Sequence, residues 1–206
     1  GLIPPHSGTV TLEGKSRNAR SERERARSVA WVQQREGTPF AFSVREWVEM
    51  GRYCHTGALG KWGPRDREAV DRALETCDLN GLQNRSLAEL SGGEAQRAHI
   101  SRALAQEARY LFLDEPLTHL DLKYQAQVLE ILLRLAREHQ QGLLCVLHDL
   151  NFARSFCQEC IFLKAGHTFR QGPAAELLEP KVVSALFDTR IQYRDTALSS
   201  DLNPSP

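Results

Sequence analysis

Two adjacent carboxylates after an apolar run are the first residues that could carry chemistry. Residues 110–113 are apolar, and Asp114 and Glu115 follow them directly, before Pro116. In a parallel sheet, ligands bind at the carboxyl ends of the strands. Asp114 could then hold Mg²⁺, directly or through water, and Glu115 could be the general base for an attacking water. The alternative is a strand that leaves the core into a polar turn.

A serine and two glycines form a second candidate site. Ser91, Gly92 and Gly93 precede a helical pattern that runs to about residue 106. A helix start offers free backbone N–H groups and the positive end of the helix dipole, and the serine adds a hydroxyl. Such a start is suited to an anion. An ordinary N-cap with flexible glycines explains the same residues equally well.

Two more polar residues stand at the ends of expected strands. His148 follows the apolar run 142–147, which is typical of a strand covered on both faces. A histidine there could reach a γ-phosphate and sense it, or could simply be a polar cap. Gln34 follows the short strand 29–32, where an amide could ligate Mg²⁺ and hinge the next segment. Gln33 is adjacent, so this assignment is open by one residue.

The tripeptide Gly14-Lys15-Ser16 matches the end of a phosphate-binding P-loop but not its beginning. The pattern G-x-x-x-x-G-K-[ST] places its first glycine at the position that Thr9 occupies here. The alternation over residues 9–13 predicts a strand, and residues 16–27 read as a solvated, charged helix. We therefore expect only a turn at this point.

The remaining pattern indicates the elements that position these residues. Strands that alternate with helices predict a largely parallel sheet with helical cover. Residues 34–90 contain no clear strand and read as a helical insert. Strands are expected over 28–33, 109–113, 142–147 and 160–164, and helices over 43–53, 65–77, 91–106, 121–138 and 150–156. A hairpin-like turn region is expected over 166–172, followed by two short helices.

Composition excludes several classes of protein. The chain has 206 residues and a formal net charge of zero, so nothing indicates a nucleic-acid partner. No apolar run reaches the roughly 18–20 residues that span a bilayer. Five cysteines without framework spacing predict reduced thiols in the cytosol. Cys157 and Cys160 have redox spacing, but they lack the flanking residues of a redox site, so no redox or metal role is expected.

Taken together, the order and spacing of these motifs resemble the nucleotide-binding subunit of ABC transporters. Residues 90–97 resemble the ABC signature, 110–116 the Walker B strand with its catalytic glutamate, 118–121 the D-loop, His148 the switch histidine and Gln34 the Q-loop glutamine. Gln33 replaces the proline that the family usually has before that glutamine. The resemblance covers about residues 1 to 175.

The resemblance implies an α/β fold of the P-loop NTPase (RecA-like) type, with a mostly parallel sheet and an inserted helical subdomain. We expect a partial catalytic core over 1–34 and 91–195, the helical subdomain over 35–90, and a flexible tail over 196–206. The family's P-loop and adenine-stacking aromatic lie ahead of the segment that matches the start of this chain. We therefore expect an N-terminally truncated domain that lacks about 40 residues at its front. We do not expect this chain alone to bind ATP tightly.

The resemblance also implies a mechanism. Two copies would sandwich two ATP molecules head to tail, with Mg²⁺ held at Gln34 and Asp114. Glu115 and His148 would act on the chain's own nucleotide, and Asp121 would interact across the dimer. The signature residues would bind the nucleotide held by the second copy; they are Ser91, Gly92, Gly93 and Gln96.

Partners and substrate follow from the same resemblance. A polytopic transmembrane permease would dock near the Q-loop and the insert, at the cytoplasmic face of the inner membrane, and a substrate-binding protein would take part indirectly. Residues 40–57 are similar to importer ATPases for iron–siderophores, haem and cobalamin, with Cys54 in place of a proline. Alternatives are an ABC ATPase for another substrate and a non-catalytic remnant or interaction module. Soluble ABC proteins of DNA repair or translation need inserts or tandem domains that this length does not hold.

Overall fold

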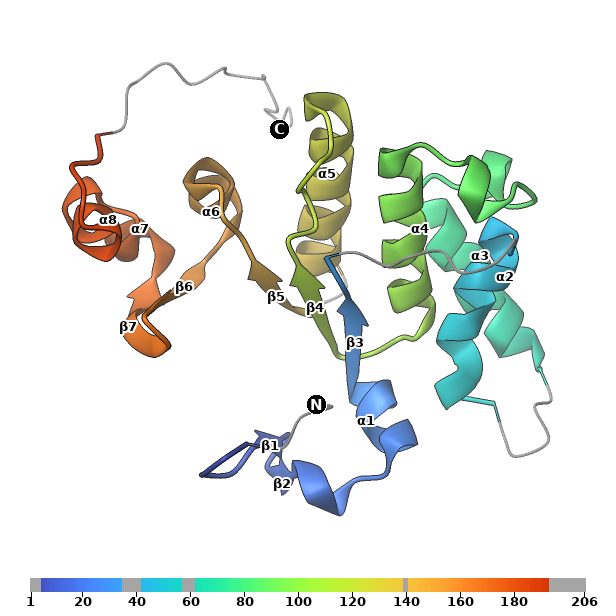
Figure 1. Cartoon of the computed structure of the whole chain (residues 1–206). Coiled ribbons are helices and arrows are strands. Elements are labelled where there is room, and N and C mark those ends of the chain that lie inside the picture. Colours follow the sequence, from blue (N-terminus) through green and yellow to red (C-terminus); the bar gives the residue numbers. More distant parts are fainter. Residues whose placement is uncertain (1–4, 35–41, 57–61, 139–140, 193–206) are drawn as a thin grey trace. The chain divides into compact units, whose positions relative to one another are not determined.

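A computed structural model of the chain describes residues 5–34, 42–56, 62–138 and 141–192 (Figure 1). The chain divides into two compact units, residues 1–147 and residues 148–206. The expected division into a core and a subdomain over 35–90 stays a prediction. The expected tail over 196–206 and residues 40, 41 and 57 of the importer-like segment lie outside the described residues.

The first unit holds most of the elements. Its strands are β1 (Thr11–Leu12), β2 (Lys15–Ser16), β3 (Val29–Val32), β4 (Tyr110–Asp114) and β5 (Gly142–Val146). Its α-helices are α1 (Glu22–Ser28), α2 (Val44–Glu49), α3 (Pro64–Thr76), α4 (Gly92–Ala105) and α5 (Leu122–Glu138). Its 3-10 helices are η1 (Arg17–Ala19), η2 (Met50–Cys54), η3 (Asn80–Leu82) and η4 (Leu87–Glu89).

The second unit is smaller. It contains α6 (Leu150–Phe156), β6 (Glu159–Lys164), β7 (His167–Pro173), α7 (Ala174–Leu177) and α8 (Pro180–Phe187). Strands β6 and β7 form an antiparallel pair around a turn at Ala165 and Gly166, both with positive φ. The expected hairpin is confirmed, but its turn is shorter than the predicted region 166–172, because residues 167–172 belong to β7. The described residues of both units include no helix that is long and apolar enough to cross a membrane.

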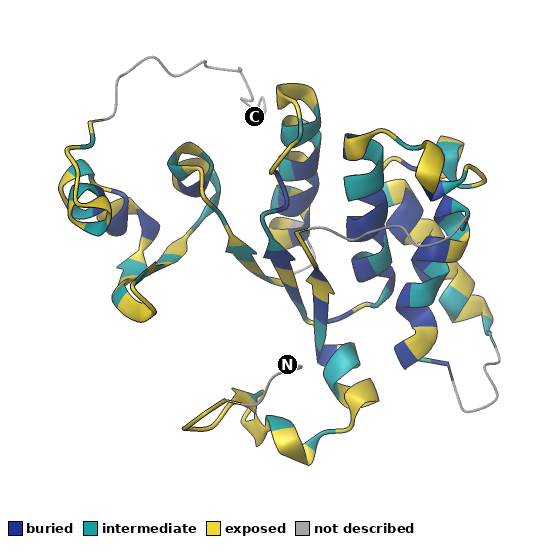
Figure 2. Ribbon diagram, viewed as in Figure 1, coloured by how far each residue is buried: buried dark blue, intermediate teal, exposed yellow. Residues whose placement is uncertain are grey.

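The parallel sheet β3-β4-β5 is the centre of the first unit, as predicted. Alternate side chains on one face are buried, including Val32, Leu111 and Leu113. The opposite face is open in the described part of the chain, and its large apolar residues are 37–51% exposed: Trp31, Phe112, Leu144 and Val146. The expectation that strand 142–147 is covered on both faces is therefore not met, since two of its apolar residues are about half exposed. Figure 2 accordingly shows exposed residues along β5.

Helices α2, α3 and α4 pack on one another beside this sheet (Figure 1). Their contact faces are fully buried at Val48, Val70 and Leu74 (Figure 2). Serine caps begin two of them: the hydroxyls of Ser43 and Ser91 accept hydrogen bonds from backbone N–H groups in the first turn. The helix bounds predicted from the sequence agree with those of α3 and α4 within one or two residues. The helix predicted over 43–53 is divided into α2 and η2 in the structure.

A buried guanidinium joins three of these segments. Arg52 of η2 is 1% exposed, and its Nη1 donates to the carbonyl of Ala105 at 2.7 Å. The same nitrogen lies 2.8 Å from the Glu107 carboxylate, and Nη2 lies 3.0 Å from Asp66 of α3. Because a buried charge is stable only when it is paired and hydrogen-bonded, this cluster fixes η2, α3 and the end of α4 together.

Gly14-Lys15-Ser16 lies in a hairpin. Glu13 and Gly14 have φ of +51° and +74°, and they form the turn between the antiparallel strands β1 and β2. Two successive positive φ values are typical of the tight turn that best fits the twist of a two-residue hairpin. The expected turn is confirmed, but strand β2 after it was not predicted, and the helix expected over 16–27 is instead η1 followed by α1.

Candidate functional site

The carboxyl edge of the parallel sheet brings together residues that are far apart in sequence. Register pairs Val32 with Leu113 and Asp114 with Val146, so β3, β4 and β5 end side by side. Asp114 is the last residue of β4 and Glu115 comes directly after it, while Gln34 comes two residues after the end of β3. This edge is the place where α/β sheets bind ligands.

Glu115 is held by two side-chain hydrogen bonds. Gln34 Nε2 donates to Glu115 Oε2 at 2.6 Å, and Thr118 Oγ1 donates to the same oxygen at 3.0 Å. The Gln34 and Glu115 positions are 81 residues apart in the chain, so only the pairing of β3 with β4 makes this contact possible. The structure thus joins Gln34, rather than the neighbouring Gln33, to the carboxylate.

The backbone at Glu115 is also unusual. Its φ is +49°, in the left-handed region that is uncommon for residues other than glycine. The Glu115 N–H still donates to the carbonyl of Val146 at 3.1 Å, so the chain stays tied to the sheet edge while it turns. Its carbonyl accepts from the Thr118 N–H at 3.2 Å. Such backbone conformations cluster at functional sites, where surrounding contacts hold them in place.

The start of α4 is a complete capping box. The Ser91 hydroxyl accepts from the Glu94 N–H at 3.4 Å and donates to the Glu94 carboxylate at 2.8 Å, and the Ser91 N–H donates to the same carboxylate oxygen at 2.8 Å. These hydrogen bonds, the backbone one first, hold the pKa of Glu94 below its ordinary value. The ordinary N-cap considered from the sequence is therefore present in the structure.

The two signature glycines differ in their surroundings. A Cβ added at Gly93 would lie 2.3 Å from Cγ of Tyr124, so this glycine lets α4 approach α5 closely. A Cβ added at Gly92 would have no heavy atom of the described chain within 4 Å. Gly92 is exposed, whereas Gly93 is buried. Packing within the chain therefore explains Gly93 and does not explain Gly92.

The remaining predicted residues lie at helix ends or on α4. Asp121 caps α5: its Oδ1 accepts from the Tyr124 N–H at 3.1 Å. Gln96 is half-buried in the first turns of α4. His148 is exposed and is the first residue of the second unit, where Asp149 caps α6 through its carboxylate. His148 thus belongs to the second unit, whereas the residues gathered at the sheet edge belong to the first.

Donor types at the sheet edge fit magnesium. Gln34 uses its amide nitrogen for Glu115, which leaves its amide oxygen as the atom of the type that Mg²⁺ prefers. Asp114 supplies a half-buried carboxylate at the end of β4. No group of three or more histidine, cysteine or acidic side chains suited to a metal occurs in the described ranges. A magnesium ion here would need further ligands from phosphate or water, as is usual for this ion.

Three contributing residues were not singled out from the sequence. Thr118 fell within the D-loop match but had no assigned role, and its hydroxyl orients Glu115. Tyr124 lies against Gly93. Arg97, within the signature match, is buried and donates to the carbonyls of Cys77 and Asp78, both at 3.1 Å. Thr118 had a signal in the sequence, because it is a hydroxyl residue three positions after a carboxylate. Tyr124 and Arg97 could not be found in this way, because their roles depend on contacts between elements.

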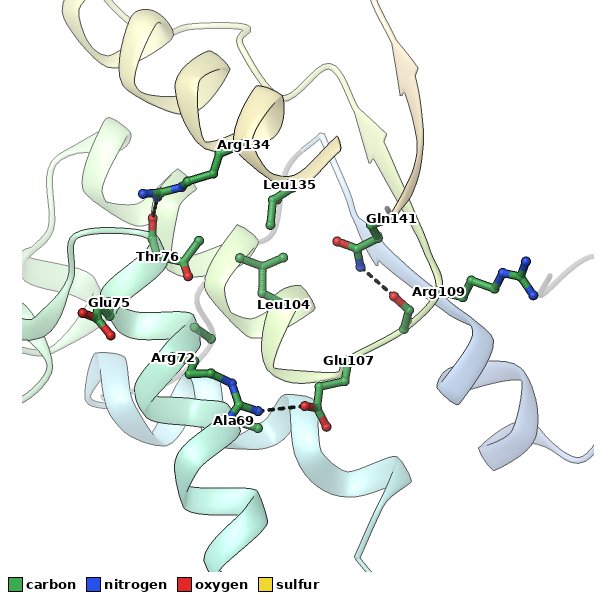
Figure 3. Close-up of a pocket in the computed structure, with 12 residues that line it drawn as sticks. Ala69, Arg72, Glu75, Thr76, Leu104, Glu107, Arg109, Arg134, Leu135 and Gln141 are labelled. Carbon is green, nitrogen blue, oxygen red and sulfur yellow. Dashed lines mark hydrogen bonds and ion pairs between the residues drawn. The ribbon is translucent and has the colours of Figure 1, made fainter. Parts of the chain in front are cut away.

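A cavity of about 590 Å³ lies elsewhere in the first unit, where α3 meets the ends of α4 and α5 (Figure 3). Two pairs of its polar groups are joined: Arg72 lies 2.9 Å from Glu107, and Gln141 donates to the Ala108 carbonyl at 2.6 Å. The residues recorded as lining it include none of the predicted site residues. We therefore assign no part of the site to it.

Comparison with known proteins places these features in a family. The model of the ABC transporter family matches residues 1–118, more than half of the chain. The chain is 37% identical to the iron(3+)-hydroxamate import ATP-binding protein FhuC of Bacillus subtilis over 186 residues, covering 90% of this chain and 69% of FhuC. It is equally identical to the cobalamin import ATP-binding protein BtuD of Halobacterium salinarum over 191 residues, but spans only 48% of that protein.

A solved structure agrees with this placement. The dimeric ATP-binding cassette MJ0796, in a post-hydrolysis state with ADP and Pi, superposes with a TM-score of 0.72 at 28% identity, covering 84% of this chain and 76% of that one. The parallel sheet, the helices beside it and the motifs at its carboxyl edge thus have the P-loop NTPase fold of such cassettes. This chain belongs to the ABC transporter family, as a member of its ATP-binding cassettes.

Proposed function

We propose that this chain is the ATP-binding and ATP-hydrolysing motor subunit of an ABC importer. The observation that carries the proposal is the Glu115 carboxylate, oriented by Gln34 and Thr118 at the carboxyl edge of the parallel sheet. A general base must be held in one position beside the proton that it removes. Two hydrogen bonds to one oxygen of Glu115 supply that positioning.

Each residue at the sheet edge then has a role. Glu115 takes a proton from the water that attacks the γ-phosphate. Gln34 and Asp114 would hold Mg²⁺, which would neutralise charge on the phosphates. His148, exposed at the start of the second unit, contacts the γ-phosphate. The Gln34 hydrogen bond to Glu115 couples the magnesium ligand to the base, since moving either side chain moves the other.

The signature residues serve the nucleotide of a second copy in a head-to-tail dimer. Gly92 supports this assignment, because a glycine in the first turn of a helix lowers helix stability and no packing in the described chain requires one here. The absence of a side chain lets an outside group approach the backbone N–H groups at the start of α4. Ser91, Gly93 and Gln96 lie around that helix start, and Asp121 reaches across the same interface. The relative MJ0796 is a dimer with ADP and Pi bound.

Substrate and membrane partner are proposed from the relatives. FhuC and BtuD are named for import of iron(3+)-hydroxamate and cobalamin. We assign this chain to the same class of importer, for iron–siderophores, haem or cobalamin, with a polytopic permease at the cytoplasmic face of the inner membrane. A substrate-binding protein would deliver the cargo on the other side.

The decisive experiment replaces the proposed base. Glu115→Gln, in the protein expressed from its complete gene together with its permease, should lower ATP turnover by about 10²- to 10⁴-fold while ATP-bound dimers accumulate. Glu130→Gln, an exposed glutamate on α5, is the matched control and should keep full turnover. Turnover of Glu115→Gln within a factor of two or so of the unaltered protein would refute the assignment of Glu115.

A further inference from the structure

The loop from Glu115 to Asp121 joins the end of β4 to the start of α5. It carries the proposed base at one end and Asp121 at the other, and Thr118 lies between them. Two of its residues, Glu115 and His119, have φ values of +49° and +65°. This conformation is unfavourable for residues other than glycine, and it persists only where surrounding contacts hold the chain in place. The loop therefore needs contacts that fix its path.

Hydrogen bonds tie both ends of this loop. The Glu115 N–H donates to the Val146 carbonyl at 3.1 Å, which fixes the start of the loop to the sheet. At the other end, the Asp121 carboxylate accepts from the Tyr124 N–H at 3.1 Å, and the Asp121 carbonyl accepts from the Gln125 N–H at 2.9 Å. These three bonds hold the ends of the loop but do not reach its middle.

A side chain of α5 ties the middle of the loop. Gln125 Nε2 donates to the carbonyl of Leu117 at 3.2 Å. The Leu117 side chain is 6% exposed, so this residue is held both by packing and through its backbone. Gln125 thus joins the first turn of α5 to the residue that directly precedes Thr118.

The peptide unit between Leu117 and Thr118 is held on both of its edges. Its carbonyl accepts from Gln125, and its N–H, which belongs to Thr118, donates to the Glu115 carbonyl at 3.2 Å. Because a peptide unit is planar, these two bonds fix its orientation and therefore the direction in which the Thr118 side chain leaves the backbone. That side chain reaches the proposed base, since Thr118 Oγ1 donates to Glu115 Oε2 at 3.0 Å.

We propose that Gln125 is a positioning residue for ATP hydrolysis. By holding the peptide unit between Leu117 and Thr118, it keeps the Thr118 hydroxyl on the Glu115 carboxylate and so keeps the base in one orientation. This role depends on the proposed function of Glu115 as the general base. Gln125 acts on the reaction only through Thr118 and contributes no contact to the nucleotide.

The test measures ATP turnover by the complete gene product together with its permease. Gln125→Leu removes the amide donor at a similar side-chain length, and Gln125→Glu keeps the shape but places an acceptor against the Leu117 carbonyl. Both variants should lower kcat at least about fivefold and leave KM for ATP within about twofold, because a misplaced base slows the chemical step without weakening nucleotide binding. Loss of one hydrogen bond should lower Tm by at most about 6 °C.

Gln127, two residues further along α5, provides the matched control. It is half-buried, as Gln125 is, and its buried side-chain oxygen has no hydrogen-bond partner in the described part of the chain. Gln127→Leu makes the same chemical change on the same helix, and it should leave kcat within about twofold of the unaltered protein.

Thr118→Val distinguishes positioning from a general effect on packing, because it removes the hydroxyl and keeps the shape of the side chain. If Gln125 acts through Thr118, then adding Gln125→Leu to Thr118→Val should lower kcat by less than about a further twofold. Losses that multiply in the double variant would overturn the proposal. So would a Gln125→Glu variant with unaltered kcat.

Glu115→Gln, measured in the same assay, separates this proposal from the proposed function. If Glu115→Gln loses turnover while both Gln125 variants keep full kcat, Glu115 is the base and the positioning role of Gln125 is refuted. If Glu115→Gln keeps its turnover, the assignment of the base fails, and the positioning role fails with it.

Discussion

The two neighbouring signature glycines should respond in opposite ways to the same substitution. In Gly93→Ala, the new methyl carbon would lie 2.3 and 2.4 Å from Cγ and Cδ1 of Tyr124. Carbon atoms normally approach to about 3.5 Å, so α4 and α5 must move apart by roughly 1 Å or the Tyr124 ring must leave its position. Overpacking of this kind costs about 1–3 kcal/mol of unfolding free energy.

Gly92→Ala meets no such obstacle, since a Cβ there has no heavy atom of the described chain within 4 Å. Alanine favours a helix over glycine by up to about 1 kcal/mol. With about 2–4 °C per kcal/mol for a chain of this size, Gly93→Ala should lower Tm by about 2–12 °C. Gly92→Ala should leave Tm unchanged or raise it by up to about 4 °C.

Urea unfolding followed by Trp47 fluorescence suits this test, because Trp47 is 6% exposed and its ring lies 5.4 Å from His99 of α4. A double-mutant cycle locates the clash. Tyr124→Ala should recover at least about 1 kcal/mol of the loss caused by Gly93→Ala. Equal stability of the two alanine variants, or additive effects of Gly93→Ala and Tyr124→Ala, would show that the close approach of α4 and α5 is not the reason for this glycine.

Two further predictions concern stability. Ser91→Ala should cost about 1 kcal/mol through loss of the cap. Because the pKa of Glu94 is lowered in the folded state, the stability that this carboxylate contributes is present above the ordinary glutamate pKa and is lost as the pH falls through the lowered one. Ser91→Ala keeps the backbone hydrogen bond to Glu94, which is the larger cause, and removes only the bond from the hydroxyl, so it should flatten the acid limb of a Tm-against-pH curve in part. An unchanged acid limb would show that the hydroxyl does not contribute. Arg52→Ala should cost about 3–5 kcal/mol, because it leaves Asp66 and Glu107 without their buried partner. If thermal unfolding shows that the unfolding free energy of Arg52→Ala is within about 1 kcal/mol of that of the unaltered chain, the Arg52 ion pairs contribute little to stability.

Sequence patterns predicted the strands and helices where apolar periodicity was strong. The start of α4 at Ser91 and the end of β4 near Asp114 followed from a capping residue and from a change from apolar to charged residues. Strand β7 was missed, because its residues are mostly polar and exposed and so carry no apolar alternation. Exposure of Leu144 could not be foreseen either, since a continuous apolar run does not say what lies on each face.

The candidate site was predictable to the level of strand ends, but not to the level of contacts. Gln34 and Glu115 each followed an expected strand, and the choice between Gln33 and Gln34 needed the observed hydrogen bond. Thr118 reaches Glu115 only because the backbone turns at a positive φ, which no local residue type announces. Arginines are mostly exposed in folded proteins, so their type did not announce that Arg52 and Arg97 lie in the interior, where backbone carbonyls and acids surround them.

The start of α4 satisfies both interpretations that the sequence left open, and Gly92 distinguishes between them. Ser91 and Glu94 form an ordinary cap, and Gly93 has a packing reason, so only Gly92 lacks an explanation within the described chain. If an outside phosphate approaches the N–H groups there, Gly92→Ala should weaken the ATP-dependent dimer at least about tenfold, or about 1.4 kcal/mol, without loss of stability. Sedimentation of the complete gene product with and without ATP measures this. If the dimer of Gly92→Ala is as strong as that of the unaltered protein, the start of α4 is not part of the proposed interface. If the dimer is weaker while the variant is at least as stable as the unaltered chain, misfolding is not the cause.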